Sequence, residues 1–239
     1  MIDKSQRIAA RVVGITYPLM FVIVSVAFFR FYAPLLVWDN VAQTVRNIMA
    51  HEHAFRIYIA ASLTYGVGMV VLLTALYVVL RPVGRGLALF AAFCRLTYAF
   101  LWFVMLLDLF GVLRLMGGSS YLQAFEPGHL EALAGLHLAS GWDAYYIGLT
   151  FYGLGTVVFS YLWFKSRYIP RTLAAWGILS SLFAGFCAFA YLVFPGFGKI
   201  VSVDWYEIPI ALFELATSFW VLIRGLRPPE MTKASKASS

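Results

Sequence analysis

Two ionisable residues inside apolar stretches, Arg95 and Glu214, are the strongest candidates for chemistry in this sequence. Arg95 interrupts an uncharged run that begins after Arg85, and Glu214 interrupts a run that ends at Arg224. A charge in such surroundings is costly and usually faces a partner or a cavity. Two interpretations follow: a static ion pair that fixes helix packing, or a polar floor that binds a ligand head group or relays protons.

The spacing of these two charges places them at a similar depth. Arg95 lies nine residues beyond Gly86, and Glu214 lies ten residues before Arg224. In helices these separations correspond to roughly 13 Å and 15 Å from the same end. Each residue is therefore the best partner available to the other, and we predict that they meet directly or through one water.

Tyrosines near this level predict a pocket. Tyr98 follows Arg95 by three residues and so shares its helix face. Tyr152 lies thirteen residues before Lys165, roughly 20 Å from the helix end and one turn above the charges. We predict a ligand-binding pocket formed by Arg95, Glu214, Tyr98 and Tyr152, in which the guanidinium holds an anionic or carbonyl group. In the alternative, the tyrosines close over the ion pair and leave no cavity.

Histidines and carboxylates form a weaker, metal-like set. No HExxH motif is present, and two histidines separated by one glutamate would point away from each other on a helix. We therefore interpret them as interfacial residues in wet segments, and we predict no metal and no other cofactor. The four histidines are His51, His53, His129 and His137, and the acids near them are Glu52, Glu131 and Asp143.

Three further polar or reactive residues lie in apolar stretches. Asp108 follows Arg95 by thirteen residues, roughly 20 Å along a helix, and cannot pair with it. We expect Asp108 near the outer interface, with Arg114 as its candidate partner. Cys94 and Cys187, the two cysteines, support neither a disulfide framework nor a thiolate metal site.

The elements that must position these residues follow from composition. Hydrophobic residues make up 62% of the 239 residues and charged residues 12%, whereas soluble domains have about 45–50% and about 25%. This excludes a soluble enzyme, a disordered chain and a coiled coil, and it indicates an integral membrane protein. The net charge of +7 is interpreted as cytoplasmic loops and not as a nucleic-acid-binding surface.

Six uncharged runs predict an all-α, polytopic transmembrane bundle in a single domain, residues 1–226, followed by a polar tail, 227–239. Each run is long enough to cross the hydrocarbon core, which is about 30 Å thick. The alternation expected of membrane strands is not seen. The predicted spans are about 12–29, 57–80, 87–113, 144–164, 172–194 and 205–223.

Basic residues predict the orientation. Twelve of the 18 lysines and arginines fall on one side of this scheme and five on the other, with Arg95 inside a span. Both termini are therefore predicted to be cytoplasmic and the chain to lie in a cell (inner) membrane. The first run resembles a signal peptide, but we expect it to be retained as a span.

Segments outside the spans also carry a helical pattern. Apolar residues recur at helical spacing within Trp38–His53 and Tyr121–Gly141, which predicts two short interfacial helices on the outer side. In the fifth span, Gly177, Ser181 and Gly185 recur every four residues. Such small residues predict close packing of a neighbouring helix of the same chain.

With the spans placed, several segments resemble a widespread bacterial family of six-span integral membrane proteins of unknown function. The match with 146–171, YIGLTFYGLGTVVFSYLWFKSRYIPR, is the most extensive. Residues 7–17, RIAARVVGITY, 91–95, and 214–225, ELATSFWVLIRG, resemble its first, third and last spans. The family often reads Leu-Gly where this chain has Leu173-Ala174. The resemblance implies a multi-pass membrane protein and no established activity.

Three functional classes remain open. The first is a protein that binds or moves a small amphipathic molecule or lipid inside the bundle, and the intramembrane charge pair favours it. The second is a membrane enzyme with a His/carboxylate site, with or without a metal, at the outer face. The third is an accessory or scaffold subunit of a membrane complex. The expected partners are membrane lipid and a small amphipathic ligand, with no nucleic acid.

Overall fold

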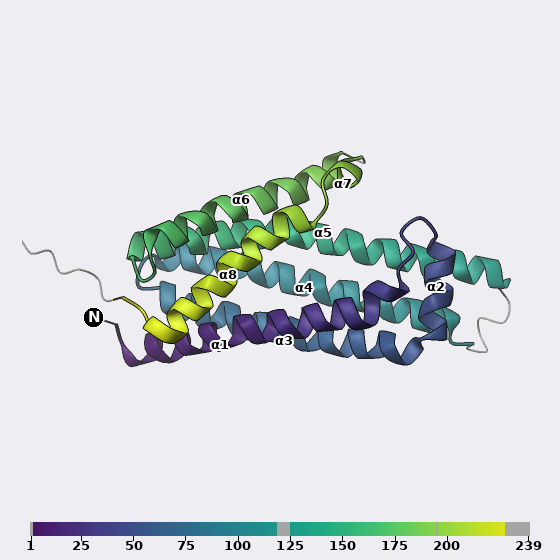
Figure 1. Cartoon of the computed structure of the whole chain (residues 1–239), viewed down its shortest axis with the longest axis horizontal. Coiled ribbons are helices and arrows are strands. Elements are labelled where there is room, and N and C mark those ends of the chain that lie inside the picture. Colours follow the sequence, from purple (N-terminus) through teal and green to yellow (C-terminus); the bar gives the residue numbers. More distant parts are fainter. Residues whose placement is uncertain (1, 119–124, 195, 228–239) are drawn as a thin grey trace, which may run out of the picture.

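The computed structural model describes residues 2–118, 125–194 and 196–227, and within them all regular secondary structure is helical (Figure 1). Six long apolar helices account for the six predicted spans. The all-α polytopic bundle is therefore confirmed. Of the predicted polar tail, residues 228–239 lie outside the described residues.

The six long helices all begin before the predicted spans, because polar residues that precede the apolar runs continue the helix. They are α1 (Lys4–Ala27), α3 (Glu52–Leu80), α4 (Arg85–Met116), α5 (Pro127–Ser166), α6 (Arg171–Val193) and α8 (Asp204–Arg224). Helix α1 continues through a π-helical turn, η1 (Phe28–Tyr32), and a 3-10 turn, η2 (Ala33–Leu35). Two short helices, α2 (Val41–Ala50) and α7 (Phe197–Ile200), complete the described elements.

The first and last long helices end at residues whose chemistry suits those positions. Asp3 and Gln6 form a capping box at the start of α1, which satisfies two backbone N–H groups that no helical carbonyl can reach. Helix α8 ends at Gly225, whose φ of 67° is favourable only for glycine.

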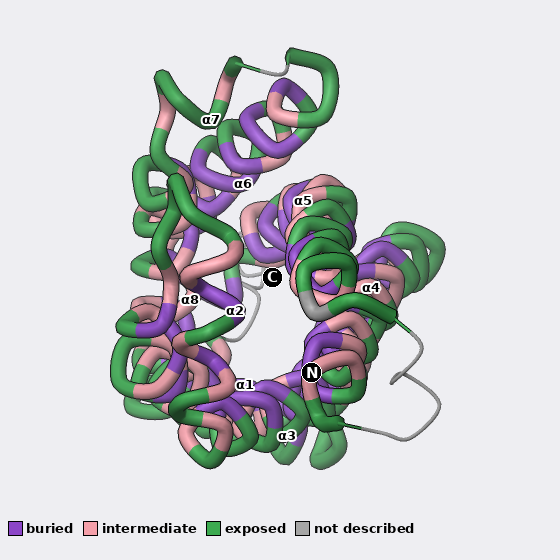
Figure 2. The backbone as a smooth tube through the Cα atoms, turned by 90° about the vertical axis from the view of Figure 1, so that its right-hand side faces the viewer, coloured by how far each residue is buried: buried purple, intermediate pink, exposed green. Residues whose placement is uncertain are grey.

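The long helices form a closed ring. Each helix packs against the next in the order α1, α3, α4, α5, α6 and α8, and α8 closes the ring on α1. Figure 2 shows this arrangement in a view along the bundle. Because α8 touches both α6 and α1, the last span completes the wall that the other five begin.

Small residues decide how closely two of these helices approach. A Cβ added at Gly153 of α5 would lie 2.6 Å from the Cα of Gly185 in α6, so the two backbones are in contact there. Gly177 of α6 faces the ring of Phe213 in α8 with no room for a side chain. The predicted role of the small residues of the fifth span in intrachain packing is thus confirmed.

One end of the bundle is sealed by a dry core. The buried side chains there come from every long helix and include Val13, Leu76, Leu162 and Trp163. Gln6 is buried among them, and its amide donates a hydrogen bond to the carbonyl oxygen of Val79 at 3.0 Å. Helix α1 begins and helix α8 ends at this same end (Figure 1), which agrees with an even number of spans.

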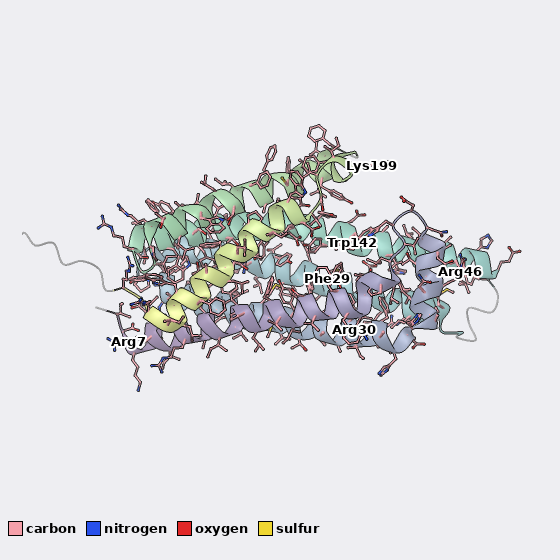
Figure 3. The ribbon with its side chains drawn as sticks, in the orientation of Figure 1. Arg7, Phe29, Arg30, Arg46, Trp142 and Lys199 are labelled. Atoms are coloured by element: carbon pink, nitrogen blue, oxygen red, sulfur yellow. The ribbon has the colours of Figure 1, made fainter. Side chains whose placement is uncertain are left out.

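The opposite end carries the predicted outer helices, one of which differs from expectation. Helix α2 is a separate short helix that runs across the bundle end (Figure 1), and Arg46 joins it to Glu131 of α5 at 3.3 Å (Figure 3). In the second segment, residues 127–141 are helical, but they are the first turns of the 40-residue α5, and residues 121–124 lie outside the described residues. Ala134 and Leu138 are buried in the core, and this packing keeps the helix continuous.

Candidate functional site

A cavity of about 270 Å³ lies inside the ring of helices. Its wall is formed by α1, α3, α4, α5 and α8, and it extends from the level of Arg95 and Glu214 toward the end where α2 lies. Tyr98 and Tyr152 belong to this wall. A cavity is therefore present above the ion pair, as the sequence predicted, although the ring of Tyr152 itself lies over Arg95. The roles of these four residues in ligand binding stay a prediction.

The floor of the cavity is the buried ion pair. Nη1 of Arg95 donates hydrogen bonds to Oε1 of Glu214 at 3.0 Å and to Oγ1 of Thr156 at 2.8 Å. Its Nη2 reaches the hydroxyl of Tyr17 at 3.4 Å, and its Cζ lies 3.9 Å from the ring centre of Tyr152. The Arg95 and Glu214 side chains are 5% and 12% exposed. The predicted direct contact is confirmed, and four helices contribute to it.

Two residues of α5 explain why the guanidinium sits in this position. A Cβ at Gly155 would lie 2.9 Å from the carbonyl oxygen of Ala91 and 3.0 Å from Cγ of Arg95, so glycine lets α4 and α5 approach closely. The Thr156 hydroxyl donates to the carbonyl oxygen of Tyr152 at 2.8 Å. Because its proton is used there, its oxygen is left to accept from Arg95.

Aromatic rings form much of the wall above the floor. Twelve of the 30 described lining residues are aromatic, whereas aromatic residues make up only 18% of the whole sequence. The rings of Tyr98 and Tyr152 meet edge to face at 4.8 Å, and Trp102 lies 4.7 Å from Tyr65. The indole of Trp102 donates to the carbonyl oxygen of Ser62 at 2.9 Å. This bond fixes the tryptophan between α3 and α4.

A second acid, Glu207, lines the cavity two helical turns above Glu214. The Tyr145 hydroxyl of α5 donates a hydrogen bond to Oε1 of Glu207. Among the described residues, no ion pair includes Glu207. The exposed Asp204 also belongs to the wall, at the start of α8. Apart from Arg95, the charged residues of the described wall are all acidic.

Spacing in the sequence could have identified the residues that our prediction of the site missed. Glu207 precedes Glu214 by seven residues, Trp102 follows Arg95 by seven, and Tyr145 precedes Tyr152 by seven. Seven residues are about two helical turns, so each pair shares a helix face. Thr156 gave no such signal, because its role depends on a neighbouring helix.

Part of the cavity wall is exposed along α1 and at the start of α8. These helices cross near Gly14, whose added Cβ would lie 3.0 Å from Cβ of Leu222, and they diverge toward the other end (Figure 1). In the diverging half, Phe21 of α1 and Phe29 of η1 line the cavity and yet are 41% and 70% exposed. Figure 3 shows Phe29 and the α5 residue Trp142, another wall residue, in this region.

Asp108 has different partners from the one predicted. Its carboxylate meets Nδ1 of His137 at 2.8 Å and accepts a hydrogen bond from Ser140 at 3.0 Å, so the predicted pairing with Arg114 is wrong. Six residues separate Asp108 from Arg114. Side chains at that spacing lie on different helix faces, whereas α5 presents His137 directly.

The remaining histidines take no part in a cluster. His51 lies 3.1 Å from the carbonyl oxygen of Asn47, and His53 and His129 are exposed. Over the described residues, no group of three or more histidine, cysteine, aspartate or glutamate side chains is arranged to hold a metal. Cys94 and Cys187 are buried free thiols.

Fold and cavity together define a multi-pass α-helical membrane protein with an aromatic internal cavity above a buried ion pair. The chain belongs to the family described as "Domain of unknown function (DUF4386)", whose profile matches residues 12–225. A search of the curated proteins and a search of the solved structures each find no match.

Proposed function

We propose that the protein binds a small amphipathic molecule, or one end of a membrane lipid, in the cavity inside the bundle. The observation that carries this proposal is a cavity of about 270 Å³ with an aromatic wall and a buried, charged floor. Small-molecule sites typically combine apolar and aromatic walls with a few convergent polar groups. The polar group of the ligand would lie beside the charged residues of the cavity, and its apolar part against the aromatic wall.

The route of access that we propose is lateral, between α1 and α8. Both helices carry an internal proline, Pro18 in α1 and Pro209 in α8, and α1 continues into the π-helical turn Phe28–Tyr32. Prolines and π-helical turns are the common sites of helix bending. A change of bend at these positions would widen or narrow the gap through which the cavity meets lipid.

The conformation described favours a binding protein over a transporter with a continuous path through the bundle. Below the ion pair, the buried side chains of the sealed end include Val13, Leu76 and Trp163. A polar molecule would have to break both the ion pair and this core to pass. Transport would therefore require a second conformation.

We further propose that the chain lies in a bacterial inner membrane with its basic end in the cytoplasm. Arg7 lies at the sealed end, whereas Arg46 and Lys199 lie at the other (Figure 3), and the larger share of basic residues falls at the sealed end. In intact cells, Ser202→Cys should react with an impermeant thiol reagent and Gly86→Cys should not. The reverse pattern would contradict this orientation.

Photolabelling of the purified protein tests ligand binding. A neutral probe, a medium-chain alcohol that carries a diazirine, should label peptides of the cavity wall. Ala211→Trp fills the cavity from α8, and Leu212→Trp is the matched control because Leu212 is 48% exposed on the outer surface. Labelling should be lost with Ala211→Trp and retained with Leu212→Trp. Equal labelling in both variants would refute the proposed site, and native mass spectrometry would identify ligands that co-purify.

A further inference from the structure

We propose that the cavity is selective for an organic cation, an amine or quaternary ammonium with an apolar substituent, whose positive group lies beside Glu207. This inference rests on the proposed function, because it assumes that the cavity is a binding site. In this proposal Glu207 recognises the charge of the ligand, and the aromatic rings of the wall face the cation.

The balance of charge in the wall favours a cation. The charged residues lining the described cavity are one base, Arg95, and three acids, Asp204, Glu207 and Glu214. Arg95 is neutralised by Glu214 at 3.0 Å, which leaves two acids without a basic partner in the wall. A carboxylate in apolar surroundings is stable only with a proton or a cation beside it.

The contacts of Arg95 favour a role in the floor of the cavity over the binding of an anion. One of its terminal nitrogens is engaged by Glu214 and Thr156, and the ring of Tyr152 covers a face of its guanidinium at 3.9 Å. An anion approaching the remaining nitrogens would also meet the negative charge of Glu214. The basic residue therefore belongs to the floor, where it orients Glu214.

Glu207 has the surroundings that cation recognition requires. The Tyr145 hydroxyl donates a hydrogen bond to Glu207 and so orients the carboxylate. The Tyr145 ring lies 6.1 Å from that of Trp102 and 5.9 Å from that of Trp142, and all three rings belong to the cavity wall. Tryptophan and tyrosine faces attract ammonium groups within about 6 Å. A carboxylate beside several such faces would bind a cation by both charge and ring quadrupole.

Three probes of similar size test the selectivity on the purified full chain in detergent. Benzyltrimethylammonium carries the cation, neopentylbenzene has the same shape with carbon in place of nitrogen, and benzenesulfonate carries an anion. Affinities are measured by displacement of the photoreactive alcohol. The cation should bind about tenfold more tightly than its neutral isostere, because only the cation is attracted by a carboxylate and by aromatic faces.

Two glutamate variants locate the effect. Glu207→Gln keeps the shape and removes the charge, and should reduce affinity for benzyltrimethylammonium by about tenfold while leaving neopentylbenzene unchanged. Glu131→Gln is the control, because Glu131 pairs with Arg46 on the exposed end of the bundle. Should Glu207→Gln fail to fold, the comparison of cation and isostere in the unaltered protein still decides.

The outcomes separate this inference from the proposed function. Equal displacement by the cation and its isostere would overturn the cation assignment and leave cavity binding intact. Tighter displacement by benzenesulfonate would also overturn it and point to Arg95 as an anion site. If the alcohol labels the wall and none of the three probes displaces it, selectivity for small cations is refuted. If the alcohol does not label the wall at all, the proposed function itself is refuted.

Discussion

The ion pair between Arg95 and Glu214 can be tested by a double-mutant cycle. Arg95→Met removes the charge while keeping an unbranched apolar side chain, and Glu214→Gln replaces the carboxylate with an amide of the same shape. Each single change leaves the other charge buried, since the side chains are only 5% and 12% exposed. The double variant leaves neither charge.

The expected magnitude follows from the geometry. Two unit charges about 4 Å apart attract by about 4 kcal/mol at an effective dielectric constant of about 20, and the closest atoms here are 3.0 Å apart. Each single change should therefore destabilise by about 3–5 kcal/mol. Thr156 and Tyr17 still accept hydrogen bonds from Arg95, so Glu214→Gln should cost less than Arg95→Met.

Thermal unfolding of the four purified proteins measures the coupling. For a chain of this length, the single changes should lower the melting temperature by roughly 6–20 °C, and the double variant should lose much less than the sum. The matched control is the exposed pair of Arg56 and Glu52, which is closer, at 2.6 Å, but 54% and 40% exposed. Its coupling should be about 0.5 kcal/mol or less. Additive losses at Arg95 and Glu214, or equal coupling in both pairs, would refute the argument.

Three further changes test the packing and polar contacts around the cavity. Gly155→Ala places a methyl group 2.9 Å from a backbone carbonyl oxygen of α4 and should destabilise the protein by about 1–3 kcal/mol. The control, Gly86→Ala, adds a methyl group that meets nothing within 4 Å and should not destabilise it. Equal melting temperatures of the two variants would contradict the close approach of α4 and α5. His137→Ala removes the 2.8 Å partner of Asp108 at the exposed end and should cost about 1 kcal/mol or less, and a larger loss of thermal stability would show that the pair is more buried than described. Trp102→Phe keeps an aromatic ring but removes the indole hydrogen bond to the carbonyl oxygen of Ser62 in α3, so unfolding should become easier by about 0.5–1.5 kcal/mol; an unchanged unfolding midpoint would argue against that bond.

The sequence by itself determined the membrane architecture and the depth of the principal charges. Uncharged runs long enough to cross a bilayer have few alternatives to transmembrane helices, because each backbone polar group must be bonded within its own segment. Helical rise then converts residue number into depth. For this reason Arg95 and Glu214, which are 119 residues apart, could be matched before any packing was known.

Only the tertiary structure decided which neighbours these residues have. Helical rise and periodicity give depth and face, but they do not say which helix stands beside which. Apolar helices in lipid associate through shape and close contact and not through hydropathy, as the contact of Gly153 with Gly185 illustrates. The partner of Asp108, the hydrogen bond from Arg95 to Thr156 and the contact of Tyr145 with Glu207 all depend on that packing. The cavity depends on them too, because it exists only where the closed ring of helices keeps its members apart.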